Sequence, residues 1–97
     1  MPAIQRLTDA NNVGGVINDT ITPGNGDVYA NGLLVSIDGS KGTSHPNFDP
    51  PHLNPIWSTA NGSSTVFVHG IPVNRTGDAD TCGHTRVGGS ADVFAGG

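Results

Sequence analysis

Residues 62–77 read GSSTVFVHGIPVNRTG, and the chain repeats this pattern at two other places. Residues 24–39 read GNGDVYANGLLVSIDG, and residues 89–97 read GSADVFAGG. All three copies fit Gly-x-x-[Asp/Thr]-Val-[Tyr/Phe]-[Ala/Val]-x-Gly, and the third stops where the other two continue. A pattern repeated within one chain indicates one small structural unit used several times.

Each full copy predicts a β-hairpin. Residues 27–30 and 65–68 are short runs of β-branched and aromatic residues between glycines, a composition that favours strands. Asn31-Gly32 suits a two-residue type I′ turn, and His69-Gly70 stands at the same place in the second copy. A lone two-stranded hairpin is marginal in water, so we expect the three copies to pack together.

The segments between the hairpins contain short strand-like leads. Residues 13–17 and 54–57 stand at similar distances before the first two hairpins, and residues 84–87 form a shorter lead before the third. Residues 1–12 predict an opening strand or a tail. No window has helical periodicity, so the sequence predicts an all-β fold. The repeat copies are predicted at approximately residues 13–39, 54–77 and 84–97 of a single domain, 1–97.

The composition predicts a thin hydrophobic core. Only 34% of the 97 residues are hydrophobic, and 15 glycines and 7 prolines leave many positions with little side chain to bury. A domain this small then needs a metal ion, a disulfide or a partner. A single cysteine excludes an internal disulfide, which leaves the metal or the partner.

The charge pattern excludes nucleic-acid binding as a function. The net charge is −4, and the four lysine and arginine residues are scattered along the chain, whereas phosphate binding needs a cluster of positive charge. Residues 1–12 contain no apolar signal region, and no stretch is long enough to span a membrane. We therefore expect synthesis in the bacterial cytoplasm without a signal peptide, and no stable membrane insertion.

Three histidines and the cysteine form a candidate metal site. Cys82 and His84 are two residues apart, so both side chains would lie on one face of an extended strand. His45 and His52 flank a proline-rich loop that could hold two imidazoles at a fixed spacing. One thiolate and three imidazoles make a closed tetrahedral set that suits one structural Zn²⁺, although the spacing matches no standard zinc finger.

Other interpretations of these residues stay open at this point. Each histidine could be an ordinary loop residue, Cys82 could be a small buried hydrophobe, and residues 40–53 could be a flexible connector. Their joint placement in the two loops that link the copies favours a shared site. His69 is expected at an exposed hairpin tip, and whether it replaces one of the four ligands is left open.

The sequence also leads us to expect no enzymatic activity. Cys82 and a histidine could in principle form a nucleophile and base pair. Nothing resembles a nucleophile elbow, a phosphate-binding loop or a pair of catalytic carboxylates. Calcium binding is disfavoured as well, because the nonapeptide calcium pattern is absent and the aspartates fit ordinary turns.

The whole chain resembles the PAAR-repeat proteins, the small tips of contractile-injection spikes in phage tails and type VI secretion systems. Residues 71–78, IPVNRTGD, look like the Pro-Ala-Ala-Arg-x-Gly-Asp segment of that family, and the hairpins at Gly62 and Gly89 and residues 82–84 (CGH) resemble its other motifs. Length and opening are most similar to those of the tip proteins of T4-like phages. Val73 and Asn74 replace the two alanines, and the first copy lacks the arginine, so we assign no site role to Arg75.

The resemblance implies a cone of short strands with pseudo-three-fold symmetry. Its N- and C-terminal parts would meet near the apex around one zinc ion. Carried over to this chain, the metal ligands are His45, His52, Cys82 and His84. They are the same four residues that the spacing indicated.

The resemblance also implies a partner and a place. A monomer would cap a trimeric β-helical spike, one copy per trimer, and would cover its open strand edges. We expect the strands around Val28, Val66 and Val93 near the base of the cone. The protein would then lie at the tail tip of a phage virion, or at the tip of a secreted type VI spike, and help to pierce the outer membrane.

The alternative is a stand-alone, zinc-stapled β-domain that recruits an effector or binds a cell surface. The sequence gives this alternative little support, because Trp57 and Tyr29 are the only tryptophan and tyrosine that could line a sugar site.

Overall fold

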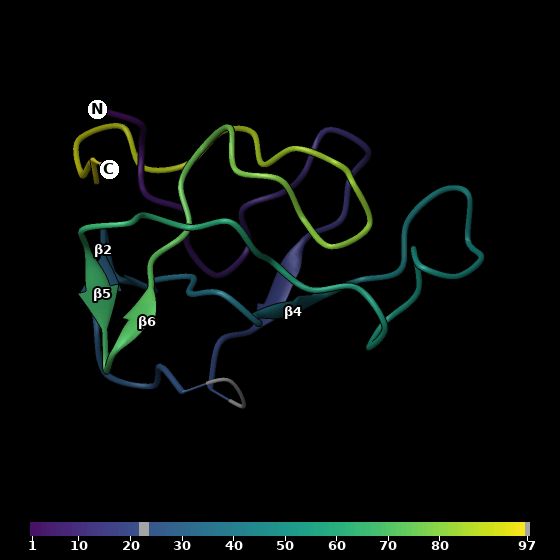
Figure 1. Ribbon diagram of the computed structural model, residues 1–97, viewed down its shortest axis with the longest axis horizontal. Coiled ribbons are helices and arrows are strands. Elements are labelled where there is room, and N and C mark those ends of the chain that lie inside the picture. The colour runs from purple at the N-terminus through teal and green to yellow at the C-terminus, as the bar shows by residue number, and fades with distance from the viewer. Residues whose placement is uncertain (22–23, 97) are drawn as a thin grey trace.

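The chain folds into short β-strands joined by turns (Figure 1). The computed structural model describes residues 1–21 and 24–96, and these residues contain no helix, which confirms the all-β prediction. Residues 22–23 of the predicted first copy and Gly97 of the third lie outside the described residues. The strands are β1 (Ile17–Asp19), β2 (Tyr29–Ala30), β3 (Leu33–Leu34), β4 (Lys41–Gly42), β5 (Phe67–Val68) and β6 (Ile71–Pro72).

Both full copies form the predicted hairpins. Strand β2 pairs antiparallel with β3, and β5 pairs antiparallel with β6. The two turn residues of each hairpin have positive φ, 55° and 77° at Asn31 and Gly32 and 51° and 81° at His69 and Gly70. Positive φ at both central residues is the geometry of a type I′ turn, which matches the twist of the flanking strands.

The third hairpin is built from the two ends of the chain. Ala3 forms an antiparallel bridge with Phe94, and the Ile4 amide donates to the Val93 carbonyl at 2.9 Å. The equivalent bonds run from the Val35 amide to the Val28 carbonyl at 2.9 Å and from the Val73 amide to the Val66 carbonyl at 3.1 Å in the other copies. The N-terminal segment, predicted as a strand or a tail, therefore completes the truncated copy.

A polar residue caps the start of each hairpin. It is the second residue of each copy, Asn25, Ser63 or Ser90, and all three are buried. Its side-chain oxygen accepts hydrogen bonds of 2.9–3.3 Å from the backbone N–H groups two and three residues later. The same local pattern of hydrogen bonds therefore begins all three hairpins.

A closed ring of backbone hydrogen bonds joins the three copies. The Gln5 amide donates to the Asn74 carbonyl at 3.0 Å, the Asn74 amide to the Ser36 carbonyl at 2.9 Å, and the Ser36 amide to the Gln5 carbonyl at 2.9 Å. All three residues are fully buried. We call these residues the closed ring. It lies on the pseudo-three-fold axis, because the flanking bridges repeat in the same order around it.

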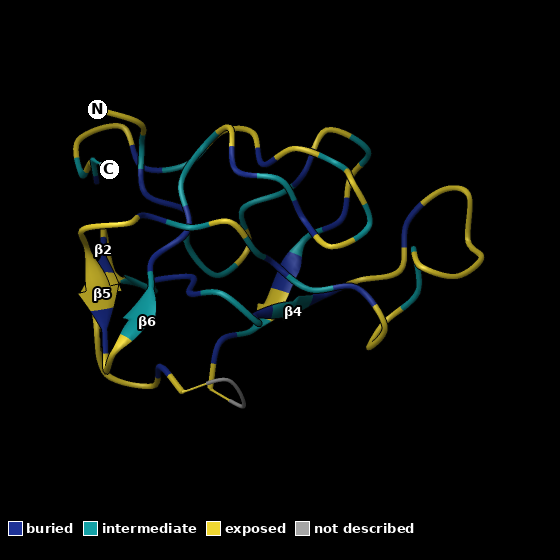
Figure 2. Ribbon diagram, in the orientation of Figure 1, coloured by how far each residue is buried: buried dark blue, intermediate teal, exposed yellow. Residues whose placement is uncertain are grey.

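The apolar core lies between the hairpins. It takes the last residue of β2 and of β5, the residue that follows β3 and the one that follows β6, the matching pair of residues from the third hairpin, and Ile37. The core residues are Ile4, Ala30, Val35, Ile37, Val68, Val73 and Ala95. The first strands β2 and β5 each have one exposed and one buried residue (Figure 2). Side chains at alternate positions therefore point into this core or away from it.

The molecule is elongated, with principal extents of 32 × 24 × 23 Å. Strands β2, β5 and β6 and both chain termini lie at one end, which we call the hairpin end (Figure 1). The loop of residues 45–53 extends from the other, the loop end. The expectation that the N- and C-terminal parts meet near the apex is therefore wrong for the termini themselves, because they pair to form the third hairpin.

Strands β1 and β4 connect the core to the loop end. Ile17 pairs with Gly42 and Asp19 with Lys41, and Ile17 and Trp57 are fully buried nearby. A Cβ atom at Gly42 would clash with the Trp57 ring and the Val16 carbonyl, so the indole packs directly on the β4 backbone. Among residues 1–21 and 24–96, no helix meets the length and hydropathy needed to cross a membrane.

We expect Ser63→Ala to lower the free energy of unfolding by about 1–3 kcal/mol, because two backbone N–H groups beneath a hairpin lose their acceptor. For a domain of this size, each kcal/mol corresponds to a decrease in Tm of roughly 4–8 °C. Thermal unfolding should leave the neighbouring exposed variant Ser64→Ala within about 0.5 kcal/mol of the wild type. Equal stability of the two variants would contradict the capping role.

Candidate metal centre

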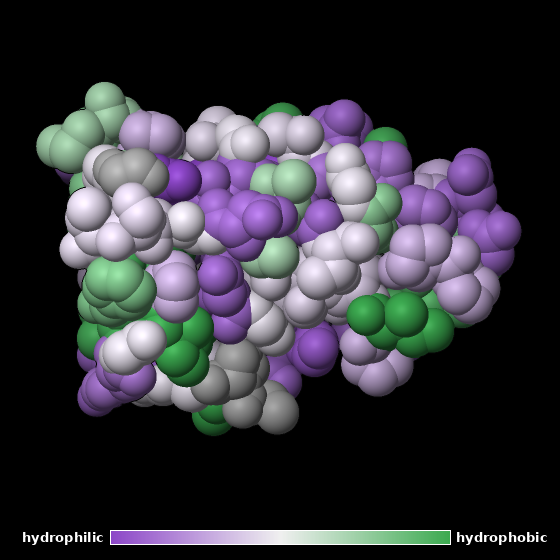
Figure 3. Space-filling model, in the orientation of Figure 1, coloured by the Kyte–Doolittle hydropathy of each residue, from purple (hydrophilic) through white to green (hydrophobic). Residues whose placement is uncertain are grey.

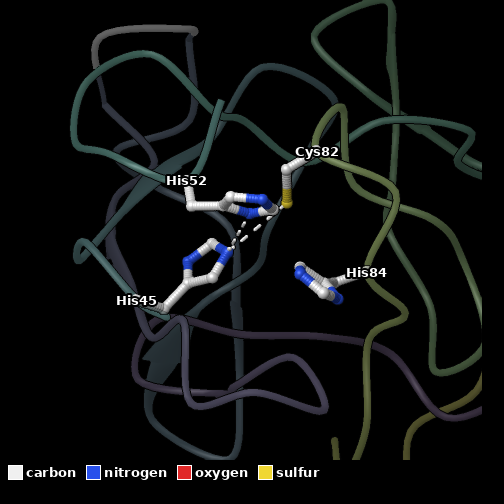
Figure 4. Close-up of side chains that lie close together, drawn as sticks. All are labelled: His45, His52, Cys82 and His84. Carbon is white, nitrogen blue, oxygen red and sulfur yellow. Dashed lines mark hydrogen bonds between the residues drawn. The ribbon is translucent and has the colours of Figure 1, made fainter. Parts of the chain in front are cut away.

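The four residues singled out by their spacing lie together at the loop end. His45 and His52 come from the segment after β4, and Cys82 and His84 from the turn closed by the Ala79–Thr85 bridge. One ligand atom of each lies within 4.8 Å of all the others, so the group could hold a metal ion. The four side chains converge on one point (Figure 4). We call these four residues the metal group.

The distances within the metal group fit tetrahedral coordination. His45 Nε2 lies 3.2 Å from His52 Nδ1 and 3.6 Å from Cys82 Sγ. Ligands bound to zinc at ordinary lengths in a tetrahedron lie roughly 3.3 Å apart for two nitrogens and roughly 3.6 Å apart for nitrogen and sulfur. The His84 ring centroid is 5.3 Å from that of His45 and 5.0 Å from that of His52.

The surroundings of His45 fix which of its nitrogens faces the metal group. Its Nδ1 lies 3.4 Å from the Thr43 carbonyl oxygen, to which an Nδ1–H would donate. Nε2 is then left with a lone pair for a metal ion. Trp57 packs edge-on against the His45 ring at 5.2 Å, and its Nε1–H donates to the same Thr43 oxygen at 2.9 Å.

Burial favours the form of His45 that binds metal. The side chain is almost completely inaccessible. Burial lowers the pKa of His45, the neighbouring His52 and His84 lower it further, and the Thr43 carbonyl opposes the shift. A neutral imidazole is the form that coordinates a metal ion, so the protein environment prepares this ligand for binding.

The turn that carries Cys82 and His84 is held by its own backbone and by the second lead segment. The Asp80 amide donates to the His84 carbonyl at 2.7 Å, and the Gly83 amide to the Asp80 carbonyl at 2.9 Å. Ser58 and Thr81 exchange two further hydrogen bonds of 2.9 Å. Because Ser58 directly follows Trp57, the tryptophan contacts the first ligand while its neighbour anchors the second ligand loop.

His69 does not join the metal group. It lies at the tip of the β5–β6 hairpin, and its Nε2 is 2.6 Å from a carboxylate oxygen of Asp27 at the start of the first hairpin. The structure thus answers the question that the sequence left open: His69 links two hairpins, and the other three histidines converge with Cys82.

Sequence analysis missed the residues that support the metal group. Asp80 and Arg86 form a fully buried ion pair of 3.0 Å beside it. Burial raises the pKa of Asp80 and lowers that of Arg86, and the charge of each residue opposes the shift of the other. The only signal in the sequence was the position of two opposite charges on either side of Cys82 and His84. Arg75 pairs with Asp78 within a separate turn, as Arg6 pairs with Asp9.

The four residues of the metal group offer enough ligand atoms for a complete tetrahedral shell. A filled tetrahedral shell leaves no coordination position for a reacting water molecule. The arrangement therefore suits an ion that holds two loops together.

Comparison with known proteins gives one informative match. No protein-family model matches the chain. The double-stranded DNA deaminase toxin A of Burkholderia cenocepacia (strain H111) is 36% identical to it over 74 residues. The matched residues make up 76% of this chain and 5% of the toxin, so the chain spans only a small part of its relative's length.

This match corrects one prediction. The sequence led us to expect a protein without enzymatic activity, and the protein that it matches is named as an enzyme. The prediction failed because it rested on the absence of familiar catalytic motifs in this chain. When a chain matches only a small part of an enzyme, the catalytic motif of that enzyme need not lie within the matched segment.

We expect the wild-type chain to contain one metal ion, and Cys82→Ser to contain much less, because a serine hydroxyl is a poor substitute for a thiolate ligand. Elemental analysis of both purified proteins measures this directly. His69→Ala is the matched control and should keep the wild-type metal content, since this histidine lies at a hairpin tip. Absence of metal from the wild type, or its loss from the control, would contradict the assignment.

Proposed function

We propose that this chain is the tip of the central spike of a contractile injection machine, a phage tail or a type VI secretion system. It caps and sharpens a trimeric β-helical spike and helps it to pierce the outer membrane. The observation that carries the proposal is the pseudo-three-fold hairpin end, where one chain supplies three equivalent hairpins around the closed ring. The resemblance to the PAAR-repeat proteins supports the same function.

The hairpin end has the symmetry and the surface that such a partner requires. Each hairpin exposes an aromatic residue at the same position, Tyr29, Phe67 and Phe94, with exposed fractions of 58%, 51% and 48%. Hydrophobic residues gather at this end (Figure 3). A three-fold symmetric partner presents the same surface three times, so a single copy of this chain can make three equivalent contacts with one trimer.

Within the strands around Val28, Val66 and Val93, which the sequence predicts near the base, the aromatic residues are better contact candidates than the valines. Val28 and Val66 are exposed to only 38% and 36%, and Val93 is partly buried against the core. Large aromatic side chains are also the residues that most often dominate binding energy at interfaces. Each valine directly precedes one of these aromatic residues in the sequence and would have a secondary part in the contact.

At the loop end, the proposed cofactor is one structural Zn²⁺. One thiolate and three imidazoles are ligands that zinc prefers, and the spacing of the metal group supports tetrahedral geometry. The ion would fasten together two loops that contain no apolar core of their own. Such a centre would help the loop end to keep its shape under load. The chain would be a monomer before it joins the spike.

A second candidate function is a module that works with a toxin. The observation that favours it is the match to a double-stranded DNA deaminase toxin, of which the matched segment is 5%. In this case the chain recruits or belongs to an effector, and any contact with a spike is secondary. The two candidates are compatible if the tip also carries a toxin.

Co-expression with a trimeric β-helical spike protein from the same genome tests the first function. We expect a complex whose native mass corresponds to one copy of this chain per three spike chains. Replacing Tyr29, Phe67 and Phe94 together by serine should abolish the complex, because all three contacts lose their apolar anchors. The matched control replaces Phe48 and Ile56, two exposed apolar residues outside the hairpins, and should assemble normally. A folded wild-type chain that forms no complex would contradict the function.

The second function is tested by incubating the metal-loaded chain with double-stranded DNA, followed by sequencing. If this chain carries deaminase activity, base changes should accumulate with time and protein concentration. They should decrease in Cys82→Ser if the metal group contributes. DNA that stays identical to a protein-free sample would contradict an activity of this chain, and the toxin-recruiting role would then require a co-purifying toxin.

A further inference from the structure

Arg86 is a fully buried cation that contacts three separate parts of the molecule. Its Nη1 donates to Asp80 Oδ2 at 3.0 Å, and both Nη atoms approach the Gly15 carbonyl oxygen at 3.4–3.5 Å. In the N-terminal segment its Nε donates to Gln5 Oε1 at 3.1 Å and its Nη2 to the Asp9 carbonyl at 2.7 Å. A guanidinium group is planar and offers donors in several fixed directions, which lets one side chain join three segments.

Two of these contacts connect Arg86 to the two loops that carry the metal group. Asp80 belongs to the turn of Cys82 and His84, and its amide donates to the His84 carbonyl at 2.7 Å. Gly15 packs against the other ligand loop, since a Cβ atom at this glycine would lie 2.8 Å from His45 Nδ1. Arg86 therefore contacts neighbours of both ligand loops.

The third contact leads to the closed ring. Gln5 is one of its three members, and the Gln5 side chain also donates to the Val87 carbonyl at 2.9 Å. The segment that follows the metal group is thus bonded directly to the centre of the pseudo-three-fold axis. Within this buried network Asp80 Oδ1 has no hydrogen-bond partner among the described residues, so the Asp80 charge depends on the bonds that its other oxygen accepts from Arg86 and Asn11. Removal of one partner from a buried charged network is costly.

We propose that Arg86 couples the metal group to the closed ring, so that a bound metal ion stabilises the ring as well as the two loops that hold the ion. The proposal rests on the metal site of the proposed function and adds a connection between the two ends of the molecule. It makes Arg86 a positioning residue, because it touches the neighbours of the ligands rather than the ion.

One hydrogen bond of the closed ring serves as an internal control for the coupling. Two of its hydrogen bonds involve Gln5, namely those donated by the Gln5 and Ser36 amides. The third runs from the Asn74 amide to the Ser36 carbonyl and does not involve Gln5. If the coupling passes through Arg86 and Gln5, removal of the metal should weaken the first two bonds more than the third.

Hydrogen exchange on the full chain, metal-loaded and stripped with a chelator, tests this proposal. Metal content is measured on the same samples. We expect stripping to lower the protection of the Gln5 and Ser36 amides about tenfold more than that of the Asn74 amide. Equal loss at all three amides, or unchanged protection after the metal has been removed, would overturn the coupling. A wild-type chain that binds no metal would overturn the site and the coupling together.

The double variant Arg86→Met/Asp80→Asn tests the route, because it removes both charges and leaves no unpaired buried ion. In this variant the extra loss at Gln5 and Ser36 should disappear. His69→Ala is the control, since His69 pairs with Asp27 at a hairpin tip, away from Arg86 and the closed ring, and should preserve the metal-dependent difference. Persistence of the difference in the double variant would show that Arg86 is not the connection. Native mass of the spike complex, measured separately, reports on the proposed function without reference to the coupling.

Discussion

Three backbone hydrogen bonds, joining Gln5, Ser36 and Asn74 in a closed ring, fix how the rest of the chain is arranged. Each residue donates to one member of the ring and accepts from the other, so buried N–H and C=O groups are satisfied where water does not reach. The residues just before them, Ile4, Val35 and Val73 at equivalent positions, enter the apolar core. The three hairpins therefore have to surround a common axis, and their exposed aromatic residues have to lie at one end.

The interior changes character between the two ends of the molecule. Beneath the hairpins the core is apolar, whereas toward the metal group it is a polar network around Arg86 and Asp80. A chain with 15 glycines has too few large side chains to fill both regions with hydrocarbon. Hydrogen bonds and the ion pair of this network replace part of that packing, although Asp80 Oδ1 has no partner among the described residues. A bound metal ion would add free energy that exists only in the folded state.

Local chemistry made part of this structure predictable from the sequence. Asn31-Gly32 between two β-prone runs defines a hairpin within a few residues, and Cys82 with His84 defines half of a metal group in the same way. The third hairpin was not predictable, because Ala3 and Phe94 come from opposite ends of the chain and no local pattern predicts their pairing. The role of Arg86 was hidden for a similar reason, since its partners Gln5 and Gly15 are far away in sequence. The expectation of no enzymatic activity rested on the absence of catalytic motifs, and the name of a relative corrected it.

Symmetry explains why one chain, rather than three, suits such a structure. A homotrimer must repeat every feature three times, so a single metal ion on its axis would need ligands in sets of three. Here the linkers between the copies differ, and two of them bring three histidines and one cysteine to one place: His45 and His52 from one, Cys82 and His84 from the other. A single chain with internal repeats can therefore keep three equivalent hairpins at one end and build one unsymmetrical centre at the other. In the proposed function, the repeat would meet a three-fold surface, and the differences between the copies would allow the other end to be built around a single centre.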